Sequence, residues 1–303
     1  MNFSFIRKLK TSLRLALNKL RLSKYVNYIG HVKLGSQLFS IPLGGYSQGL
    51  ESLLLLQLSF KTDLLRLAES VANTTCFVDI GANTGQTMLE YFSFRRSGTY
   101  YGFEPNPKAY ALLQELNKLN TLDANLMPWA CSDSNQPAKL YTLSELDSSA
   151  TVDNLLRADQ HRKTIFICEY EFDKTIDSFS LPNNFIVKID VEGAELGVFR
   201  GMQITLATCR PLVICEVLHA HRSQDINSNN LHKAAVEEIL CQFGYGIYAC
   251  TLDHNNRLSA LLRIEAFPRD IVYADSPGSV DYVFCPVELQ QQLDSAIIQQ
   301  ISA

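Results

Sequence analysis

Short apolar segments alternate with segments of helical periodicity from Cys76 onward. Because strands that alternate with helices usually pair in parallel, this pattern predicts an α/β fold with a doubly wound parallel sheet. We expect helices over residues 85–93, 107–119, 194–202 and 231–242. The expected strands are "CFVDI", "TYYGFE", "ANLMPWACSD", "NFIVKID" and "PLVICEV", and "YGIYAC" and "VDYVFCP" are expected to close the sheet.

Two regions depart from this alternation. Within residues 138–170, "AKLYTL" and "TIFICEYEF" predict an inserted β-hairpin with a polar loop. Residues 1–70 are expected to form an N-terminal extension and residues 71–303 the main domain. The extension combines a basic amphipathic helix over 3–22, a turn-rich β segment from Gly30 to Gly45 and a helix over 50–70.

Charge and cysteine content narrow the function classes. The net charge is −4, yet every charged residue before Glu51 is basic, so the rest of the chain is acidic. An acidic body disfavours binding to a phosphate backbone, so we expect no nucleic-acid partner. The eight cysteines include no C-x-x-C pair and no spacing typical of zinc. No apolar run is long enough for a signal peptide or a membrane span, which favours a cytoplasmic location.

Acidic residues lie at or near the ends of all five core strands. They are Asp79, Glu104, Asp133, Asp190 and Glu216. Because the carboxyl ends of parallel strands form one ligand-binding edge, these acids should converge there and repel one another. A cation, a metal or many hydrogen-bond donors would offset that repulsion. S-adenosylmethionine has this profile, since it carries a sulfonium, an ammonium, a ribose diol and an adenine amine.

The loop after the first strand also favours this cofactor. Its spacing is G-x-x-x-G, from Gly81 to Gly85, whereas a dinucleotide site uses G-x-G-x-x-G. A nicotinamide oxidoreductase is therefore the weaker alternative. The two glycines would let the backbone approach the methionine part, and Asn83 would bond within the loop or to that part. Asp79 either contacts the ligand or binds loop amides.

Further residues are expected in the cofactor site, and for two of them a purely structural role is the alternative. Glu104 is expected to accept both ribose hydroxyls. Asn106 either contacts the ligand or caps the helix that begins at Pro107. Ser132 and Asp133 belong to a stretch, "CSDSN", where Asp133 either reaches the adenine amine or is a plain turn residue.

The candidate catalytic residues are Asp190, Glu216 and His219. Methyl transfer is an in-line displacement, and the acceptor hydroxyl must lose a proton. Asp190 could serve as base, orient the hydroxyl or bind a divalent cation, and these three residues could together hold such an ion. A loop histidine such as His219 could equally be only solvated. Lys188 alternates with Asp190 on its strand and is expected to form a structural salt bridge.

The ordered blocks resemble the FkbM-type methyltransferases. They are "FVDIGANTGQT", "FEPNPKAYALLQELNKLN", "MPWACSD", "TIDSF", "FIVKIDVEGAELGVFRGM" and "RPLVICEV". The resemblance covers roughly Cys76 to Val217. It implies a Rossmann-like doubly wound methyltransferase sheet with strand order 3-2-1-4-5 and closing strands 6 and 7, within a methyltransferase domain over 71–303. It also implies dependence on S-adenosylmethionine.

The expected activity is O-methylation of a hydroxyl on a sugar or on a glycan or polysaccharide precursor. The alternatives are a methyltransferase of a non-sugar small molecule or lipid, and a cofactor-binding scaffold without turnover. The helix over 3–22 would either lie on an anionic membrane surface, at the inner face of the membrane, or pack on the domain or on a second subunit. The sequence leaves the oligomeric state open.

Overall fold

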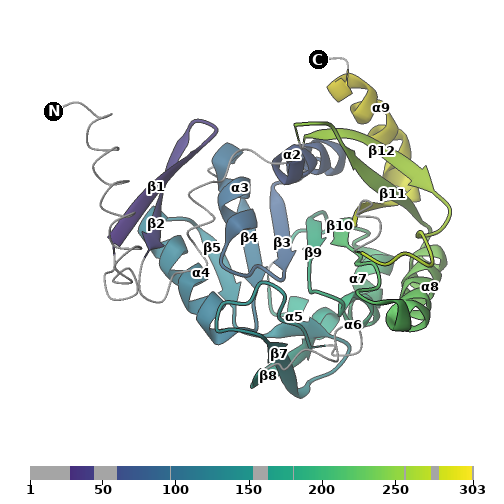
Figure 1. Cartoon of the computed structure of the whole chain (residues 1–303). Coiled ribbons are helices and arrows are strands. Elements are labelled where there is room, and N and C mark those ends of the chain that lie inside the picture. The colour runs from purple at the N-terminus through teal and green to yellow at the C-terminus, as the bar shows by residue number, and fades with distance from the viewer. Residues whose placement is uncertain are drawn as a thin grey trace.

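A large mixed sheet with helices on both faces forms the centre of the molecule (Figure 1). The computed structural model describes residues 28–43, 60–95, 97–152, 163–179, 181–255, 257–273 and 280–301. The expected helix over 3–22 and the first part of the expected helix over 50–70 lie outside these ranges. Within the described ranges, no helix has both the length and the apolarity to cross a membrane.

The central sheet contains eight strands among the described residues, in the order β12-β11-β13-β10-β9-β3-β4-β5. Five of them pair in parallel. These five are β3 (Cys76–Ile80), β4 (Thr99–Phe103), β5 (Ala124–Met127), β9 (Ile186–Ile189) and β10 (Leu212–Glu216). The other three are antiparallel, namely β11 (Tyr245–Leu252), β12 (Leu258–Ile264) and β13 (Asp281–Pro286).

Helices bury each face of this sheet in a separate apolar cluster, because every central strand is apolar on both sides. The first cluster joins α2 (Phe60–Ala72), α3 (Gln86–Phe94), α4 (Pro107–Asn120) and α9 (Gln290–Ile301) to one face. The second cluster covers the opposite face with α5 (Phe172–Ile176), α6 (Glu195–Gly201), α7 (Gln203–Thr208) and α8 (Ile226–Gln242). The short 3-10 helices are η4 (Ser223–Asp225) and η5 (Val287–Leu289).

Two smaller β units extend the fold. The hairpin of β1 (Tyr28–Leu34) and β2 (Gln37–Leu43) packs into the first cluster. A second, three-stranded sheet contains β6 (Ala130–Ser132), β7 (Gln136–Thr142) and β8 (Lys163–Glu171), and its β7–β8 hairpin hangs below the central sheet in Figure 1. This hairpin is the insertion that the sequence predicts, and its connecting segment reaches the candidate site.

The predicted α/β fold with a doubly wound sheet is confirmed, and the parallel strands have the expected 3-2-1-4-5 arrangement. Four details differ. The predicted strand "ANLMPWACSD" is divided into β5 and β6 at Pro128, which has no N–H for a continuing ladder. Helix α8 begins at Ile226, inside the predicted polar loop, and β12 was not predicted. The predicted boundary at residue 70 falls within α2, and the division into an N-terminal extension and a methyltransferase domain stays a prediction.

Candidate functional site

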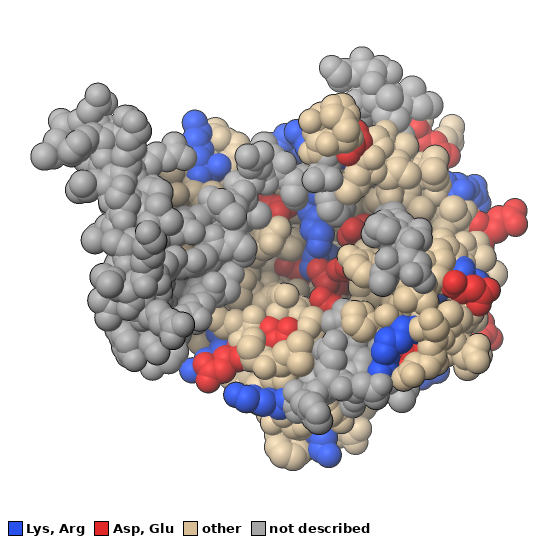
Figure 2. Space-filling view, in the orientation of Figure 1, with Lys and Arg blue, Asp and Glu red and all other residues tan. Residues whose placement is uncertain are grey.

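A cavity of about 460 Å³ opens at the carboxyl ends of β3, β4, β9 and β10. In Figure 2 the same face of the molecule has a hollow in which acidic and basic side chains lie side by side. Its volume is within the usual range for small-molecule sites. Of the predicted site residues, five line its wall: Gly81, Asn83, Glu104, Asp190 and Glu216.

Glu104 lies where β4 ends, and its carboxylate is held by backbone N–H groups. The N–H of Asn83 donates to Oε2 at 2.8 Å, and the N–H of Asn106 donates to Oε1 at 2.7 Å. Burial raises the pKa of Glu104 to about 7, although these two hydrogen bonds act in the opposite direction. Each oxygen keeps acceptor capacity, because a carboxylate oxygen can accept more than one hydrogen bond. The group can therefore bind a pair of hydroxyls.

The loop between β3 and α3 needs glycine at Gly81 for close packing. Gly81 has φ +84°, and a Cβ built there would lie 1.9 Å from the carbonyl oxygen of Asp190. Asn83 also has positive φ, which asparagine tolerates better than most residues. Gly85 has a different role from the one predicted: a Cβ there would meet Leu113 and Leu116 of α4 at under 3 Å, so Gly85 serves helix packing.

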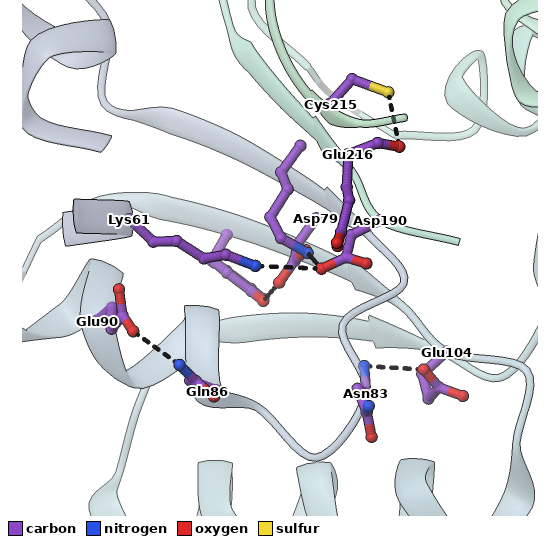
Figure 3. A network of polar contacts seen from close by, with 11 residues as sticks. Lys61, Asp79, Asn83, Gln86, Glu90, Glu104, Asp190, Cys215 and Glu216 are labelled. Carbon is purple, nitrogen blue, oxygen red and sulfur yellow. Dashed lines mark hydrogen bonds and ion pairs between the residues drawn. The ribbon is translucent and has the colours of Figure 1, made fainter. Parts of the chain in front are cut away.

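Two lysines and two aspartates form an ion network (Figure 3), and all but Asp79 line the cavity. Lys188 on β9 lies between Asp79 Oδ1, at 3.1 Å, and Asp190 Oδ2, at 3.2 Å. Lys61, from the start of α2, contacts the same Asp190 Oδ2 at 3.5 Å. The expected salt bridge of Lys188 is confirmed. The network adds positive charge to an edge that the sequence presents as purely acidic.

Asp190 and Glu216 lie at the ends of neighbouring strands, and their pKa values are shifted in opposite directions. Burial disfavours the Asp190 carboxylate, but the charges of Lys188 and Lys61 outweigh it and hold the pKa of Asp190 below its usual range. Burial, followed by the Asp190 charge, raises the pKa of Glu216 to about 9. Near neutral pH, Glu216 therefore keeps its proton and shares it with Asp190 through a side-chain hydrogen bond.

The far wall of the cavity comes from the inserted sheet. Trp129 lies in this wall and packs edge-on against Phe103 and Tyr170. Its indole N–H is buried and has no hydrogen-bond partner among the described residues. The same wall includes the segment after β7, with Leu146, Asp147, Ser148, Ala150, Thr151 and Val152. This wall therefore combines the Trp129 side chain with polar and apolar residues of the segment after β7.

Several predicted ligand residues do not line the cavity. Asp79 is fully buried, and its carboxylate accepts from Tyr100 and pairs with Lys188. Asn106 accepts from the N–H of Lys108, which is the helix-cap alternative. Ser132 is buried under α6, where Gly201 packs on its carbonyl. Asp133 is exposed at a bend, as a turn residue would be. These four contact the cavity through neighbours at most.

His219 does not line the cavity with Asp190 and Glu216. It is buried, and its Nδ1 is 3.0 Å from Nζ of Lys233. Burial and the nearby Lys233 charge lower the pKa of His219 to about 4. The described residues contain no group of three His, Cys, Asp or Glu side chains placed to hold a metal. The predicted triad of Asp190, Glu216 and His219 is therefore not assembled, and the predicted base role of His219 lacks access to the cavity.

Sequence reasoning missed Lys61, which lines the cavity from outside the recognisable blocks. A lysine at the start of an apolar helix resembles ordinary surface charge, and only the packing of α2 across β9 brings it to Asp190. Glu195, at the start of α6, also follows Asp190 closely in sequence, but its contacts are structural. It accepts from the N–H of Gly193 and contacts His232 at 3.0 Å.

Comparison with known families matches residues 79–247, more than half of the chain, to the methyltransferase FkbM domain. Comparison with curated proteins found no match. Similar solved structures include a methyltransferase FkbM from Methylobacillus flagellatus KT, at 13% identity and TM-score 0.42. That alignment covers 70% of this chain and 44% of the other, so this chain spans less than half of that structure's length.

Two other solved structures are also similar in part. One is a precorrin-6y C5,15-methyltransferase from Geobacter metallireducens GS-15, at 11% identity and TM-score 0.35, with 73% of this chain and 86% of the other covered. The second is the plantazolicin methyltransferase BpumL in complex with a monoazolic desmethylPZN analogue and SAH, at 11% identity and TM-score 0.32, with 62% of this chain and 68% of the other covered. Because these similarities are remote, the family assignment depends on the domain match.

Proposed function

The chain belongs to the FkbM methyltransferase domain family, and on this premise we propose that it transfers a methyl group from S-adenosylmethionine to a hydroxyl of a sugar or glycan precursor. The observation that carries the cofactor proposal is the buried Glu104 carboxylate at the end of β4. It is fixed by two N–H groups and opens into the cavity. A ribose diol offers the two donors that this carboxylate can accept.

The rest of the wall fits the other parts of the cofactor. The loop from Gly81 to Thr84 offers backbone to the methionine part, and Trp129 lies in the wall that adenine would meet. When bound, S-adenosylmethionine supplies the methyl group on a positively charged sulfur. Asp190 and Glu216 lie at the ends of β9 and β10, whereas Trp129 follows β5 on the other side of β3 and β4, so the two acids form the acceptor side.

The acceptor side fits a hydroxyl better than an apolar group. Its wall includes Gln86 and Thr87 in addition to the Asp190–Glu216 pair, so a hydroxylated molecule would find several hydrogen-bond partners. This polar character supports a sugar over the hydrocarbon part of a lipid as the acceptor.

The charge states suggest when the proton leaves. Asp190 is a weak base, since two lysines stabilise its carboxylate, so it orients the hydroxyl through a hydrogen bond while the oxygen attacks the methyl carbon. As the O–CH₃ bond forms and the C–S bond breaks, the proton on the oxygen becomes strongly acidic. Asp190 then accepts that proton, and it can pass to solvent through the open cavity.

Calorimetric titration with S-adenosylhomocysteine tests the cofactor proposal. We expect Glu104→Ala to weaken binding by at least about tenfold, because hydrogen bonds to a charged group contribute roughly 1.5–3 kcal/mol each. Glu115→Ala, which removes an exposed acid from α4, is the matched control and should bind as wild type does. Equal binding by Glu104→Ala and wild type would remove Glu104 from the cofactor site.

The acceptor proposal needs its own test. A radiolabelled methyl group should move from S-adenosylmethionine to a hydroxylated sugar or glycan fraction, and Asp190→Asn should lose that transfer while keeping affinity for S-adenosylhomocysteine. Transfer only to lipids or to non-sugar small molecules would favour the alternative acceptors. Cofactor binding without transfer to any fraction would favour a scaffold.

A further inference from the structure

The first residues of α2 are anchored to three different parts of the molecule. Lys61 pairs with Asp190 at the end of β9. Thr62 donates to Glu90 of α3 at 3.0 Å. Asp63 forms a bidentate ion pair with Arg257, which lies between β11 and β12. Thr62 and Asp63 are both buried. Three consecutive side chains therefore fix the start of this helix, and with it the direction of Lys61.

The helix would not be held this firmly by its apolar face alone. Glu90 is fully buried and also accepts from Gln86 at 3.1 Å, so a hydrogen-bonded chain connects Thr62 to a residue of the cavity wall. Buried polar groups that are satisfied in this way specify one arrangement of the elements that carry them. These hydrogen bonds therefore fix the position of the start of α2 relative to the cavity.

Lys61 reaches the acceptor end of the cavity. Figure 3 shows its side chain extended toward Asp190, with Glu216 on the other side of that carboxylate. The side chains of Lys61 and Asp190 are 28% and 21% exposed, so both can contact a bound molecule. Lys61 also lies outside residues 79–247, the segment that matches the family. The acceptor side is therefore completed by an element that the family match does not include.

The positive charge of Lys61 acts on this end of the cavity in two ways. It helps to keep Asp190 ionised beside the protonated Glu216. Asp281, which pairs with Glu216 across β10 and β13, is a further acid near Lys61. The charge of Lys61 also repels any cation bound at this end, including the sulfonium. A lysine at this position disfavours the charged donor relative to the product, whose sulfur is neutral, and this repulsion is relieved as the positive charge leaves the sulfur in the transition state.

We propose that Lys61 is a positioning residue of the methyl-transfer site, which holds the Asp190 carboxylate in place and sets the charge at the point where the methyl group is transferred. This proposal depends on the function proposed above. It assigns to α2 a direct part in the reaction, in addition to its packing against the sheet.

A pair of cofactor analogues tests the proposal without knowledge of the acceptor. Sinefungin carries a protonated amine near the position of the transferred methyl, whereas S-adenosylhomocysteine is uncharged there. Lys61→Met removes the repulsion, so at low salt it should bind sinefungin about fivefold more tightly relative to S-adenosylhomocysteine. Lys61→Arg keeps the charge and should keep the wild-type ratio. Asp190→Asn should change the ratio in the opposite direction.

The controls separate positioning from stability. Lys118→Met removes an exposed lysine from α4 and should leave the ratio unchanged. Lys61→Gln keeps a donor without the charge and provides the same test if the methionine variant melts early. An unchanged affinity ratio in both neutral variants would overturn the proposal, as would an equal loss for both ligands that follows a fall in melting temperature. If wild type binds neither analogue, the proposed function itself fails.

Discussion

Glu104 shows how burial and hydrogen bonding act on one carboxyl group. Its pKa is raised to about 7, mainly by burial, and the ionised form is the one that can accept from two hydroxyls. We therefore expect affinity for S-adenosylhomocysteine to fall as the pH drops below about 7, approaching tenfold per pH unit. Titrations between pH 5.5 and 8.5 measure this, and Glu104→Ala should remove the dependence. A flat wild-type profile would contradict it.

Glu216 should make stability depend on pH. Its pKa rises from an ordinary value of 4.5 to about 9 in the folded protein, so between these values the folded state binds more protons than the unfolded state. Wild-type stability from this group is complete below pH 4.5 and declines as pH rises through 9. Glu216→Gln has no such proton. Its melting temperature relative to wild type should therefore increase from pH 6 to pH 9, and a constant difference would contradict the shared proton.

The site residues differ in how far sequence could predict them. Glu104, Asp190 and Glu216 end apolar strands, so the rule that parallel strands end at one edge placed them correctly at the cavity. Asp79 also ends a strand, but its carboxylate is buried beneath Lys188. The rule gives the edge of the sheet and does not say how deep a side chain lies. Asp133 failed for another reason, because the chain leaves the central sheet at Pro128.

At the scale of elements, the close approach of β3 and β9 makes a sharp test. Gly81→Ala would place a methyl group 1.9 Å from the Asp190 carbonyl, so the two strand ends would have to separate. We expect a loss of roughly 2–4 kcal/mol in the free energy of unfolding, together with loss of cofactor binding. Urea denaturation and calorimetry with S-adenosylhomocysteine measure the two effects.

Gly244 is the matched control for this substitution. It also has positive φ, +69°, but a Cβ there would have its nearest contact at 3.9 Å, with the end of Arg210. Gly244→Ala should therefore cost only the backbone strain, about 1–2 kcal/mol, and leave binding intact. Equal costs for the two variants would show that the contact with Asp190 adds nothing.

Element prediction succeeded where periodicity and burial agree. The strands β3, β4, β9 and β10 are short apolar runs buried on both faces, so their type and order could be predicted. The start of α8 could not, because its first turns are polar and carry asparagines that are typical of loops. Strand β12 was also missed. Its polar and apolar residues do not alternate cleanly, and it is recognised only by its pairing with β11.

For the whole molecule, α2 joins the region before the family match to the catalytic sheet. Leu64, Leu65 and Val71 are buried in the cluster that covers one face of the sheet. A variant that lacks residues 1–73 should therefore be insoluble or unfolded, whereas one that lacks residues 1–27 should remain folded and bind S-adenosylhomocysteine within about twofold of wild type. Circular dichroism and calorimetry provide the comparison. A folded, binding-competent 74–303 fragment would contradict this account.

The distribution of charge also changes at this scale. Sequence reasoning expected five acids to receive a cation, but in the structure three of them line the cavity and two lysines join them. Lysines from other elements, such as Lys61, cannot be placed from sequence because contacts across a fold depend on helix packing. The site is therefore better described as a nearly balanced ion network with one buried acid, Glu104, beside it.

The most direct test of the central claim is a crystal structure of the protein with S-adenosylhomocysteine. We predict that its ribose hydroxyls bind the Glu104 carboxylate and that its sulfur faces the Asp190–Glu216 pair and Lys61. Ligand bound elsewhere, or a ribose that does not contact Glu104, would contradict the account.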